Sequence, residues 1–233
     1  FIFMGLLYFY RIYERKTEKN PSNLLIFGLV YAISILLLKG ISTLSAMEGS
    51  DFSFFIPAAL CTMLLIVLLD DRYAISFTII LGIFGAIIFN ENATSNFNIT
   101  VGLYILLSGT SAILLLSVRQ LKTRLFQTGL LLSLCQLCII LALVLTMNLQ
   151  VTKMDYASYV FSAAISGITS SILTIGLLPF FEATFGILST IKLIELSNPN
   201  HPLLRKILTE TPGTYHHSVM VANLAEAASE AIG

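Results

Sequence analysis

Two adjacent histidines near the C-terminal end are the side chains of this sequence best suited to chemistry. They stand in the segment Pro-Gly-Thr-Tyr-His-His-Ser at 212–218. The Pro-Gly pair ends a short preceding helix and Thr214 is a suitable N-cap, so the pattern predicts a helix over 215–232. At about 100° per residue, His217 shares one face of this helix with Val221, Leu224, Ala228 and Ile232. We therefore expect His217 to point toward a buried surface.

An inward histidine on an apolar face has two interpretations. It is either a hydrogen-bonded core residue or a metal ligand, and the spacing alone favours the core residue. His216 lies about 100° away on the same helix and does not share the face. Glu226 and Glu230 fall on the opposite face, where we expect solvated charges and not ligands.

Other polar side chains lie within apolar stretches. Cys135 and Cys138 have C-x-x-C spacing, but they stand among Leu and Ile with no second pair, so we interpret them, like Cys61, as small apolar side chains without a disulfide. Gln136 is the most polar side chain deep in an apolar segment. A hydrogen bond from Gln136 to a neighbouring helix is favoured over a contact with a substrate.

Composition indicates an integral membrane protein. The 233 residues are 56% hydrophobic and 11% charged, where a soluble domain has about a quarter charged residues. The formal net charge is zero, so no overall field favours a nucleic acid polymer as partner. The sequence starts at Phe1 within an apolar run, and we expect both ends to be truncated.

Seven apolar segments are predicted to cross a bilayer, and six of them are close to the roughly 20 residues that a helix needs for this. Residues 1–10 are interpreted as the back half of the first. The other six are 24–38, 54–69, 73–90, 99–118, 125–147 and 157–181. None of these six has an ionisable residue near its middle, which argues against an ion-coupled transporter. A polar crevice of Ser and Thr side chains stays open as an alternative.

The distribution of basic residues predicts the orientation. Eleven of the 13 basic residues fall in alternate connections and after the last span, and the other connections hold only Lys39 and Lys153. Because Lys and Arg concentrate on the cytoplasmic side, the C-terminal part is predicted to be cytoplasmic and the N-terminal end outside.

The last span and the residues after it have patterns of their own. Ala163, Gly167 and Ser171 recur every four residues, beside a row of serines at 162, 166 and 170, which predicts close packing inside the bundle. This is either ordinary helix packing or the path by which movement reaches the C-terminal segment. Gly176 and Pro179 are expected to break or kink the helix.

Residues 182–196 are then interpreted as a connector helix, lying along the membrane interface or packing on a following domain. Beyond it, Asn-Pro-Asn at 198–200 predicts a turn, and Pro202 suits the start of a short helix over 203–208.

Three segments after the seven predicted spans resemble a known family. They are Leu-Ser-Asn-Pro-Asn-His-Pro-Leu-Leu at 196–204, the 212–218 segment, and Val-Ala-Asn-Leu-Ala-Glu-Ala-Ala at 221–228. With the spans, they resemble the bacterial seven-transmembrane HD-domain phosphohydrolases, the PgpH type of cyclic-di-AMP phosphodiesterase. The specific part of the resemblance is confined to 193–232.

The resemblance implies a sensory domain before the spans and a cytoplasmic HD domain after them that hydrolyses a cyclic dinucleotide. It implies two divalent metal ions, manganese or iron, that clamp the phosphate and activate water. The family's first metal-ligand histidine stands directly before the serine of a His-Ser-x-x-Val-Ala pattern, which here is His217. No His-Asp pair occurs in this sequence. We expect that pair beyond Gly233, with no catalytic residue in this chain and no activity from it alone.

The predicted fold is therefore an all-α membrane protein: a seven-transmembrane bundle with a truncated first helix over 1–181, a connector over 182–196, and the start of an all-α HD domain over 197–233. The predicted function is a plasma-membrane-anchored, metal-dependent phosphohydrolase whose bundle contacts the bilayer and can relay a signal. A seven-helix receptor or scaffold with a non-catalytic cytoplasmic domain is the alternative. The sequence leaves a homo-oligomer open.

Overall fold

The computed structural model describes residues 21–48, 52–69, 71–90, 97–117, 124–146, 153–187 and 190–232. These residues form helices and short connections, and no strand occurs among them. The segment 1–10, interpreted as the end of a first span, lies outside the described residues. The chain divides into two units, Phe1–Ile187 and Leu188–Gly233, which are described separately.

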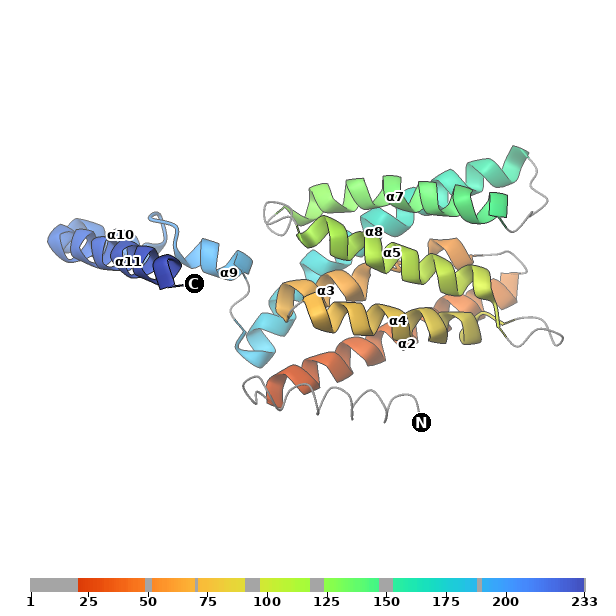
Figure 1. Ribbon diagram of the computed structural model, residues 1–233, viewed down its shortest axis with the longest axis horizontal. Helices are drawn as coiled ribbons and strands as arrows, with labels where there is room; N and C mark the ends of the chain where they lie inside the picture. The colour runs from red at the N-terminus through yellow and green to blue at the C-terminus, as the bar shows by residue number, and fades with distance from the viewer. Residues whose placement is uncertain are drawn as a thin grey trace. The chain divides into compact units, whose positions relative to one another are not determined.

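The first unit is a bundle of apolar helices (Figure 1). Its elements are α2 (Pro21–Glu48), η1 (Ser53–Phe55), α3 (Leu60–Leu68), α4 (Asp71–Ile88), α5 (Ile99–Ser117), α7 (Leu125–Thr146) and α8 (Lys153–Phe185). Within the described part of the chain, five of them, α2, α4, α5, α7 and α8, are long and apolar enough to cross a membrane. The prediction of an all-α membrane fold is confirmed.

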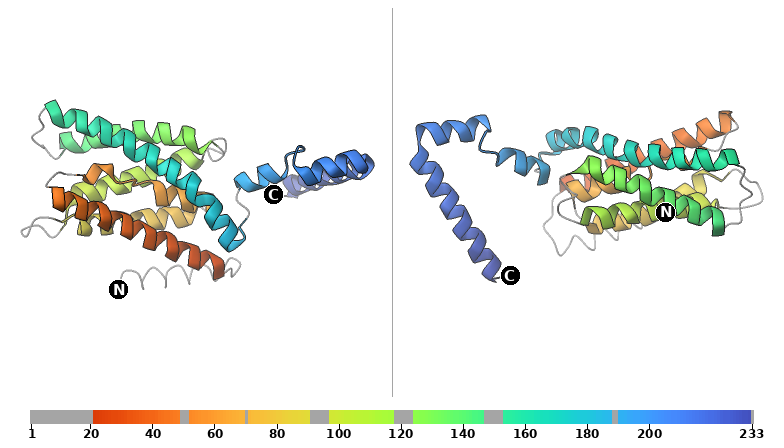
Figure 2. Two further views of the ribbon diagram at one scale, coloured as in Figure 1. Left: turned by 180° about the vertical axis from the view of Figure 1, so that it is seen from behind. Right: turned by 90° about the horizontal axis from the view of Figure 1, so that it is seen from above.

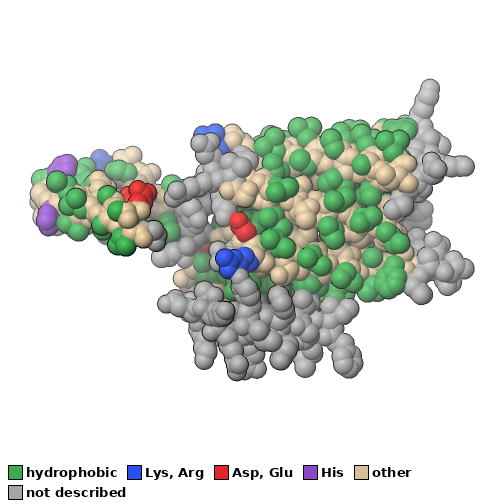
Figure 3. Space-filling model, viewed as in Figure 1, with side chains coloured by type: hydrophobic (Ala, Val, Ile, Leu, Met, Phe, Trp, Pro, Cys, Tyr) green, Lys and Arg blue, Asp and Glu red, His purple; other side chains and the backbone are tan. Residues whose placement is uncertain are grey.

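Apolar side chains are spread along the face of the bundle that Figure 3 shows. Leu36 of α2 and Leu114 of α5 are 73% and 72% exposed, although both are large hydrophobic residues. In water such a surface would aggregate, whereas lipid tails solvate it at no cost. The exposed faces of these helices are therefore suited to a bilayer.

Helix α2 is longer than the predicted span of 24–38. It begins at Pro21 and continues to Glu48, so Lys39 is an exposed residue within the helix and not part of a connection. Proline suits the first helical turn because it has no N–H to leave unpaired. No further proline follows until Pro57, so nothing in the covalent chain forces an end at residue 38.

The predicted span 54–69 is interrupted near its beginning. The single 3-10 turn η1 and helix α3 are separated by non-helical residues around Pro57. Proline disfavours helical geometry in the residue before it, and Ile56 accordingly has an extended conformation with φ −58° and ψ 128°. All nine residues of α3 are buried, so α3 is the centre of the bundle.

Two helix pairs in the bundle pack at very close range, through small residues. In the antiparallel pair α4–α5, a Cβ placed on Gly102 would lie 2.8 Å from the Ala86 Cβ atom and 3.0 Å from the Gly82 carbonyl oxygen. In the pair α7–α8, a Cβ on Gly167 would lie only 2.6 Å from the Ser133 backbone nitrogen. Figure 2 shows α7 and α8 side by side in both views.

The same α7–α8 contact tests the predicted packing of the last span. Ser171 fits against Gly129, and Ala163 and Ser171 are buried at 1% and 0% exposure. The prediction that the small residues of this helix pack inside the bundle is confirmed.

Helix α8 does not break where the sequence predicts. It runs without interruption from Lys153 through Pro179 to Phe185 and ends before Gly186, whose φ is +64°. Glycine reaches this left-handed conformation without steric cost, which makes it the usual helix terminator. Phe181, 0% exposed, lies beyond Pro179, and its burial favours continuation of the helix.

The second unit consists of α9 (Thr190–Leu196), α10 (Pro202–Glu210) and α11 (Pro212–Ile232). The expected connector of 182–196 thus contains the end of α8 and all of α9. The predicted turn at 198–200 is confirmed, because the Asn200 N–H donates to the Asn198 side-chain oxygen over 3.0 Å. Pro202 stands at the start of α10, as predicted.

Candidate functional site

The start of α11 determines where His217 lies. The helix begins at Pro212, three residues before the predicted start, so Thr214 is inside the helix and the prediction of Thr214 as its N-cap is wrong. The Thr211 carbonyl accepts hydrogen bonds from the N–H groups of Thr214 and Tyr215 at 3.1 and 3.2 Å. Proline is favoured in the first turn of a helix, which explains the early start.

The apolar face predicted for α11 is present, but nothing in the described residues covers it. His217 is exposed, and Val221, Leu224 and Ile232 are 50%, 68% and 85% exposed. Helix α10 packs on α11 without burying any residue of α11. The prediction that His217 is inward therefore depends on a partner that these residues do not supply.

The other candidate residues near His217 are also exposed. The ring of His216 lies edge-on to that of Tyr215, with their centroids 5.9 Å apart. Glu226 and Glu230 are exposed, but so is the apolar face of α11, so their assignment as solvated charges stays a prediction. Within the described ranges, no group of three or more His, Cys, Asp or Glu side chains is close enough to hold a metal ion. The described residues therefore do not form a metal centre by themselves.

A second polar cluster, which the sequence does not reveal as such, lies inside the bundle where η1 and α3 are separated. The Tyr104 hydroxyl of α5 lies 3.1 Å from the Phe54 carbonyl oxygen and 3.0 Å from the Ser166 Oγ of α8. The Ser166 hydroxyl donates to the Ile56 carbonyl oxygen. We call Tyr104, Ser166 and these two carbonyls the α5–α8 seam. Non-helical backbone at membrane depth requires partners of this kind, since lipid supplies none.

Sequence reasoning placed Ser166 in the row of serines but did not single out Tyr104. Both residues are 0% exposed. The available signal was Pro57 inside an apolar segment, because proline there frees backbone carbonyls that other side chains must satisfy.

A further buried polar side chain of the bundle is unsatisfied. Gln136 of α7 is 0% exposed, and within the described residues its side-chain N and O atoms have no hydrogen-bond partner. The expected hydrogen bond from Gln136 to a neighbouring helix is therefore absent among these residues. An unsatisfied buried polar group costs about 1–3 kcal/mol, so this packing is suboptimal at Gln136. Ser108 of α5 is equally buried and lies beside the Tyr104 hydroxyl.

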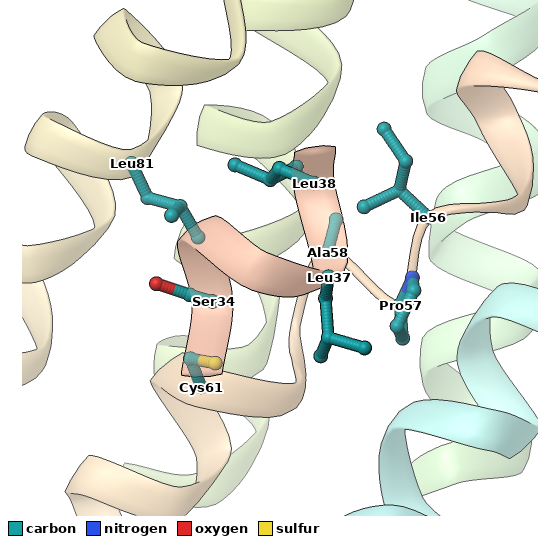
Figure 4. Close-up of a pocket in the computed structure, with 8 residues that line it drawn as sticks. All are labelled: Ser34, Leu37, Leu38, Ile56, Pro57, Ala58, Cys61 and Leu81. Atoms are coloured by element: carbon teal, nitrogen blue, oxygen red, sulfur yellow. The ribbon is translucent and has the colours of Figure 1, made fainter. Parts of the chain in front are cut away.

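A small pocket lies on the other side of the separation between η1 and α3 (Figure 4). It is lined by Ser34, Leu37, Leu38, Ile56, Pro57, Ala58, Cys61 and Leu81. Its two polar side chains bond to backbone: the Ser34 hydroxyl donates to the Tyr31 carbonyl over 2.7 Å, and the Cys61 thiol points to the Val30 carbonyl at 3.9 Å. The pocket is thus an apolar packing defect and not the Ser/Thr crevice left open by the sequence.

Comparison with known proteins relates both units to one family. The family described as "7TM receptor with intracellular HD hydrolase" matches residues 1–189. The chain belongs to this family. It is 42% identical over 228 residues to the cyclic-di-AMP phosphodiesterase PgpH of Bacillus subtilis, covering 98% of this chain and 32% of that protein. It is 38% identical over 218 residues to the PgpH of Listeria monocytogenes, covering 92% and 29%.

These matches extend through α11, because 98% coverage includes most of 190–232 as well as the bundle. The chain spans about a third of the length of the PgpH relatives it matches. No solved structure matches it. The resemblance to the seven-transmembrane HD-domain family is confirmed.

Proposed function

We propose that this chain is the membrane part and the first helices of the HD domain of a cyclic dinucleotide phosphodiesterase that acts on cyclic-di-AMP. The observation that carries the proposal is the identity of 42% and 38% to two proteins named for that activity, over nearly the whole chain. The proposed organisation is a bundle over 1–181, a connector over 182–196 and the start of the HD domain over 197–233.

HD hydrolases generally depend on metal ions. We infer two divalent ions, manganese or iron, which when bound neutralise charge on the phosphate and activate water. His217 contributes one ligand, and the remaining ligands, including a His-Asp pair, come from the rest of the longer protein. The position of His217, directly before Ser218 on the apolar face of α11, supports this role. The exposure of that face is consistent with a helix whose apolar side packs on other helices of the HD domain.

The proposed orientation places the HD domain in the cytoplasm and the N-terminal end of the chain outside. It is supported by the basic residues, including Arg72 and Arg124 at the starts of α4 and α7. Lys39, one of the two exceptions, is a residue of α2 and not of a connection.

We further propose that the bundle relays a signal to the HD domain. Support comes from α8, which is unbroken to Phe185 and is followed in the chain by α9. Substitutions in α9 that leave both basal and signal-dependent hydrolysis unchanged in the longer protein would contradict the relay.

The enzyme proposal is tested by replacing one histidine at a time. In the longer protein, purified in detergent and supplied with manganese, His217→Ala should reduce cyclic-di-AMP hydrolysis by more than about 100-fold, since even outer-shell changes at metal sites cost 10–100-fold. The bound metal, measured by mass spectrometry, should fall as well.

The matched control is His216→Ala, which removes an adjacent imidazole from a different face and should keep most of the activity. If His217→Ala retained full activity and metal content, His217 would not be a ligand. If the longer protein bound no metal and hydrolysed no cyclic dinucleotide, the receptor or scaffold function would replace the enzyme.

A further inference from the structure

The described bundle contains two tightly packed helix pairs, which pack on each other through α5 and α7 and on the central α3, and which also share a polar contact. In α4–α5 the close approach is at Gly82, Gly85 and Gly102, and in α7–α8 it is at Gly129 and Gly167. Interfaces of small residues bring backbones together over a long contact and leave little room for movement. Each pair should therefore behave as one rigid body.

The α5–α8 seam connects these two bodies. Tyr104 belongs to the α4–α5 pair, Ser166 belongs to the α7–α8 pair, and their hydroxyls are 3.0 Å apart. Both also bond to backbone carbonyls, Tyr104 to that of Phe54 in η1 and Ser166 to that of Ile56 directly after η1, so the separation between η1 and α3 lies at the same point. Figures 1 and 2 show α3 between α4 and α8, and α3 packs on both.

A buried polar side chain without a hydrogen-bond partner in the described residues lies close to this seam. Since Gly129 faces Ser171 and Gly167 faces Ser133, α7 and α8 are antiparallel, and Gln136 is level with residue 164 of α8. This is within one turn of Ser166. Gln136 is buried without a partner in the described residues, and Ser108, one turn beyond Tyr104 on the same face of α5, is buried beside the Tyr104 hydroxyl.

We propose that the α5–α8 seam is a movable joint: the α7–α8 pair has a second position relative to α4–α5, and Tyr104 and Ser166 hold the position described here. Hydrogen bonds are well suited to this role, because they are discrete and can be exchanged, whereas interdigitated small-residue contacts must separate entirely. The unsatisfied Gln136 gives a second position a hydrogen bond to gain.

The proposed joint is argued from contacts inside the bundle. Only the effect of its movement on hydrolysis rests on the proposed function. Ser166 is 19 residues before the end of α8, or about 28 Å along the helix at 1.5 Å per residue. A small rotation at the seam would thus be carried by α8 to its far end, after which α9 follows in the chain.

The test measures distances between spin labels on this 233-residue chain in lipid nanodiscs, with the three native cysteines replaced by alanine. One pair of labels, at Ile79 of α4 and Leu134 of α7, spans the joint. Two further pairs, Ile79 with Leu114 and Leu134 with Ile172, report within each rigid body. All four positions are exposed. Pulsed electron paramagnetic resonance gives the distance distributions without any activity measurement.

Tyr104→Phe and Ser166→Ala should each add a second population to the distribution across the joint and leave both distributions within the pairs unchanged. Ser162→Ala and Ser170→Ala are matched controls, because in the described part of the chain these buried serines of α8 donate only to carbonyls of their own helix, those of Tyr159 and Ser166. They should change none of the distributions.

Two results would overturn the joint. One is an unchanged distribution across the joint in both Tyr104→Phe and Ser166→Ala. The other is a change within the pairs as large as that across them, which would make the seam a general support of the bundle. Because no hydrolysis is measured, a negative result here would not contradict the phosphodiesterase proposal. Failure of the phosphodiesterase proposal would likewise not contradict the joint.

Discussion

Helices α3 and α11 show how differently apolar side chains are buried in the two units. All nine residues of α3 are buried, whereas none of the 21 residues of α11 is. Helix α3 is apolar on every side and is surrounded by other helices of the bundle. Helix α11 has one apolar face, with charged residues opposite, and α10 packs on it without burying any of its residues.

The described bundle thus covers its most apolar helix, whereas the described residues leave the apolar face of α11 open. A helix that is apolar all round belongs in an interior, and an amphipathic helix requires a partner for its apolar stripe. In the bundle, even small side-chain substitutions should therefore change the stability. In α11, such substitutions should change the stability only when a partner covers its apolar face.

The strongest effect that we expect is a dependence of α11 on its context. Leu224→Ala should change the stability of α11 in this chain by less than about 0.5 kcal/mol, because Leu224 is 68% exposed. In the longer protein, where we expect the face to be covered, the same substitution should cost about 2–5 kcal/mol. Hydrogen exchange of the α11 amides measures both values.

Glu230→Ala on the opposite face is the control for Leu224→Ala and should be neutral in both chains. An equal and small effect of Leu224→Ala in the two chains would mean that the face stays open, and the comparison between α3 and α11 would then need another explanation.

The next effect concerns the close packing of the bundle. Gly167→Ala should destabilise the bundle by about 1–3 kcal/mol, because the added Cβ meets the Ser133 backbone, which cannot move alone. Gly176→Ala, in the same helix, meets nothing within 4 Å and should be neutral or slightly stabilising. Unfolding in mixed detergent micelles compares the two, and equal effects would contradict the close α7–α8 contact.

The smallest effect has the opposite sign. Gln136→Leu should stabilise the bundle by about 1 kcal/mol, because it removes two polar atoms that have no partner in the described residues. The exposed Gln127 of the same helix, 3.5 Å from the Arg124 guanidinium, is the control, and Gln127→Leu should change stability by less than about 0.5 kcal/mol. Destabilisation by Gln136→Leu would mean that Gln136 has a partner in the membrane.

The extent of several helices could be predicted because the bilayer fixes it. The predicted spans 73–90, 99–118 and 125–147 differ by two residues or fewer at each end from α4, α5 and α7. Their ends coincide with polar residues, and the cost of burying polar groups in hydrocarbon is large enough to act locally.

The ends of α2 and α8 could not be predicted in this way. Glycine and proline are weak helix formers in isolation, yet α2 continues past Gly40 and α8 past Pro179. Packing of neighbouring side chains, such as the fully buried Phe181, outweighs local propensity when an element is already held in a bundle.

For the candidate site, the sequence alone specifies the residue types on the faces of α11 and carries the resemblance that assigns His217 a role. Periodicity follows from helix geometry, so the grouping of His217 with Val221 and Leu224 needs no tertiary information. The metal-ligand role of His217 stays a prediction, since the described residues bring no further ligand near it.

How polar groups in the bundle are satisfied depends on tertiary packing. Tyr104, Ser166 and the carbonyl of Phe54 are more than 40 residues apart along the chain, yet they share hydrogen bonds. Gln136, the most conspicuous polar residue in the sequence of the bundle, bonds to none of the described residues. Hydropathy depends on composition along one helix and so specifies which segments are buried in lipid, whereas a hydrogen bond depends on the distance and angle between atoms of different helices. That geometry exists only after the helices have packed.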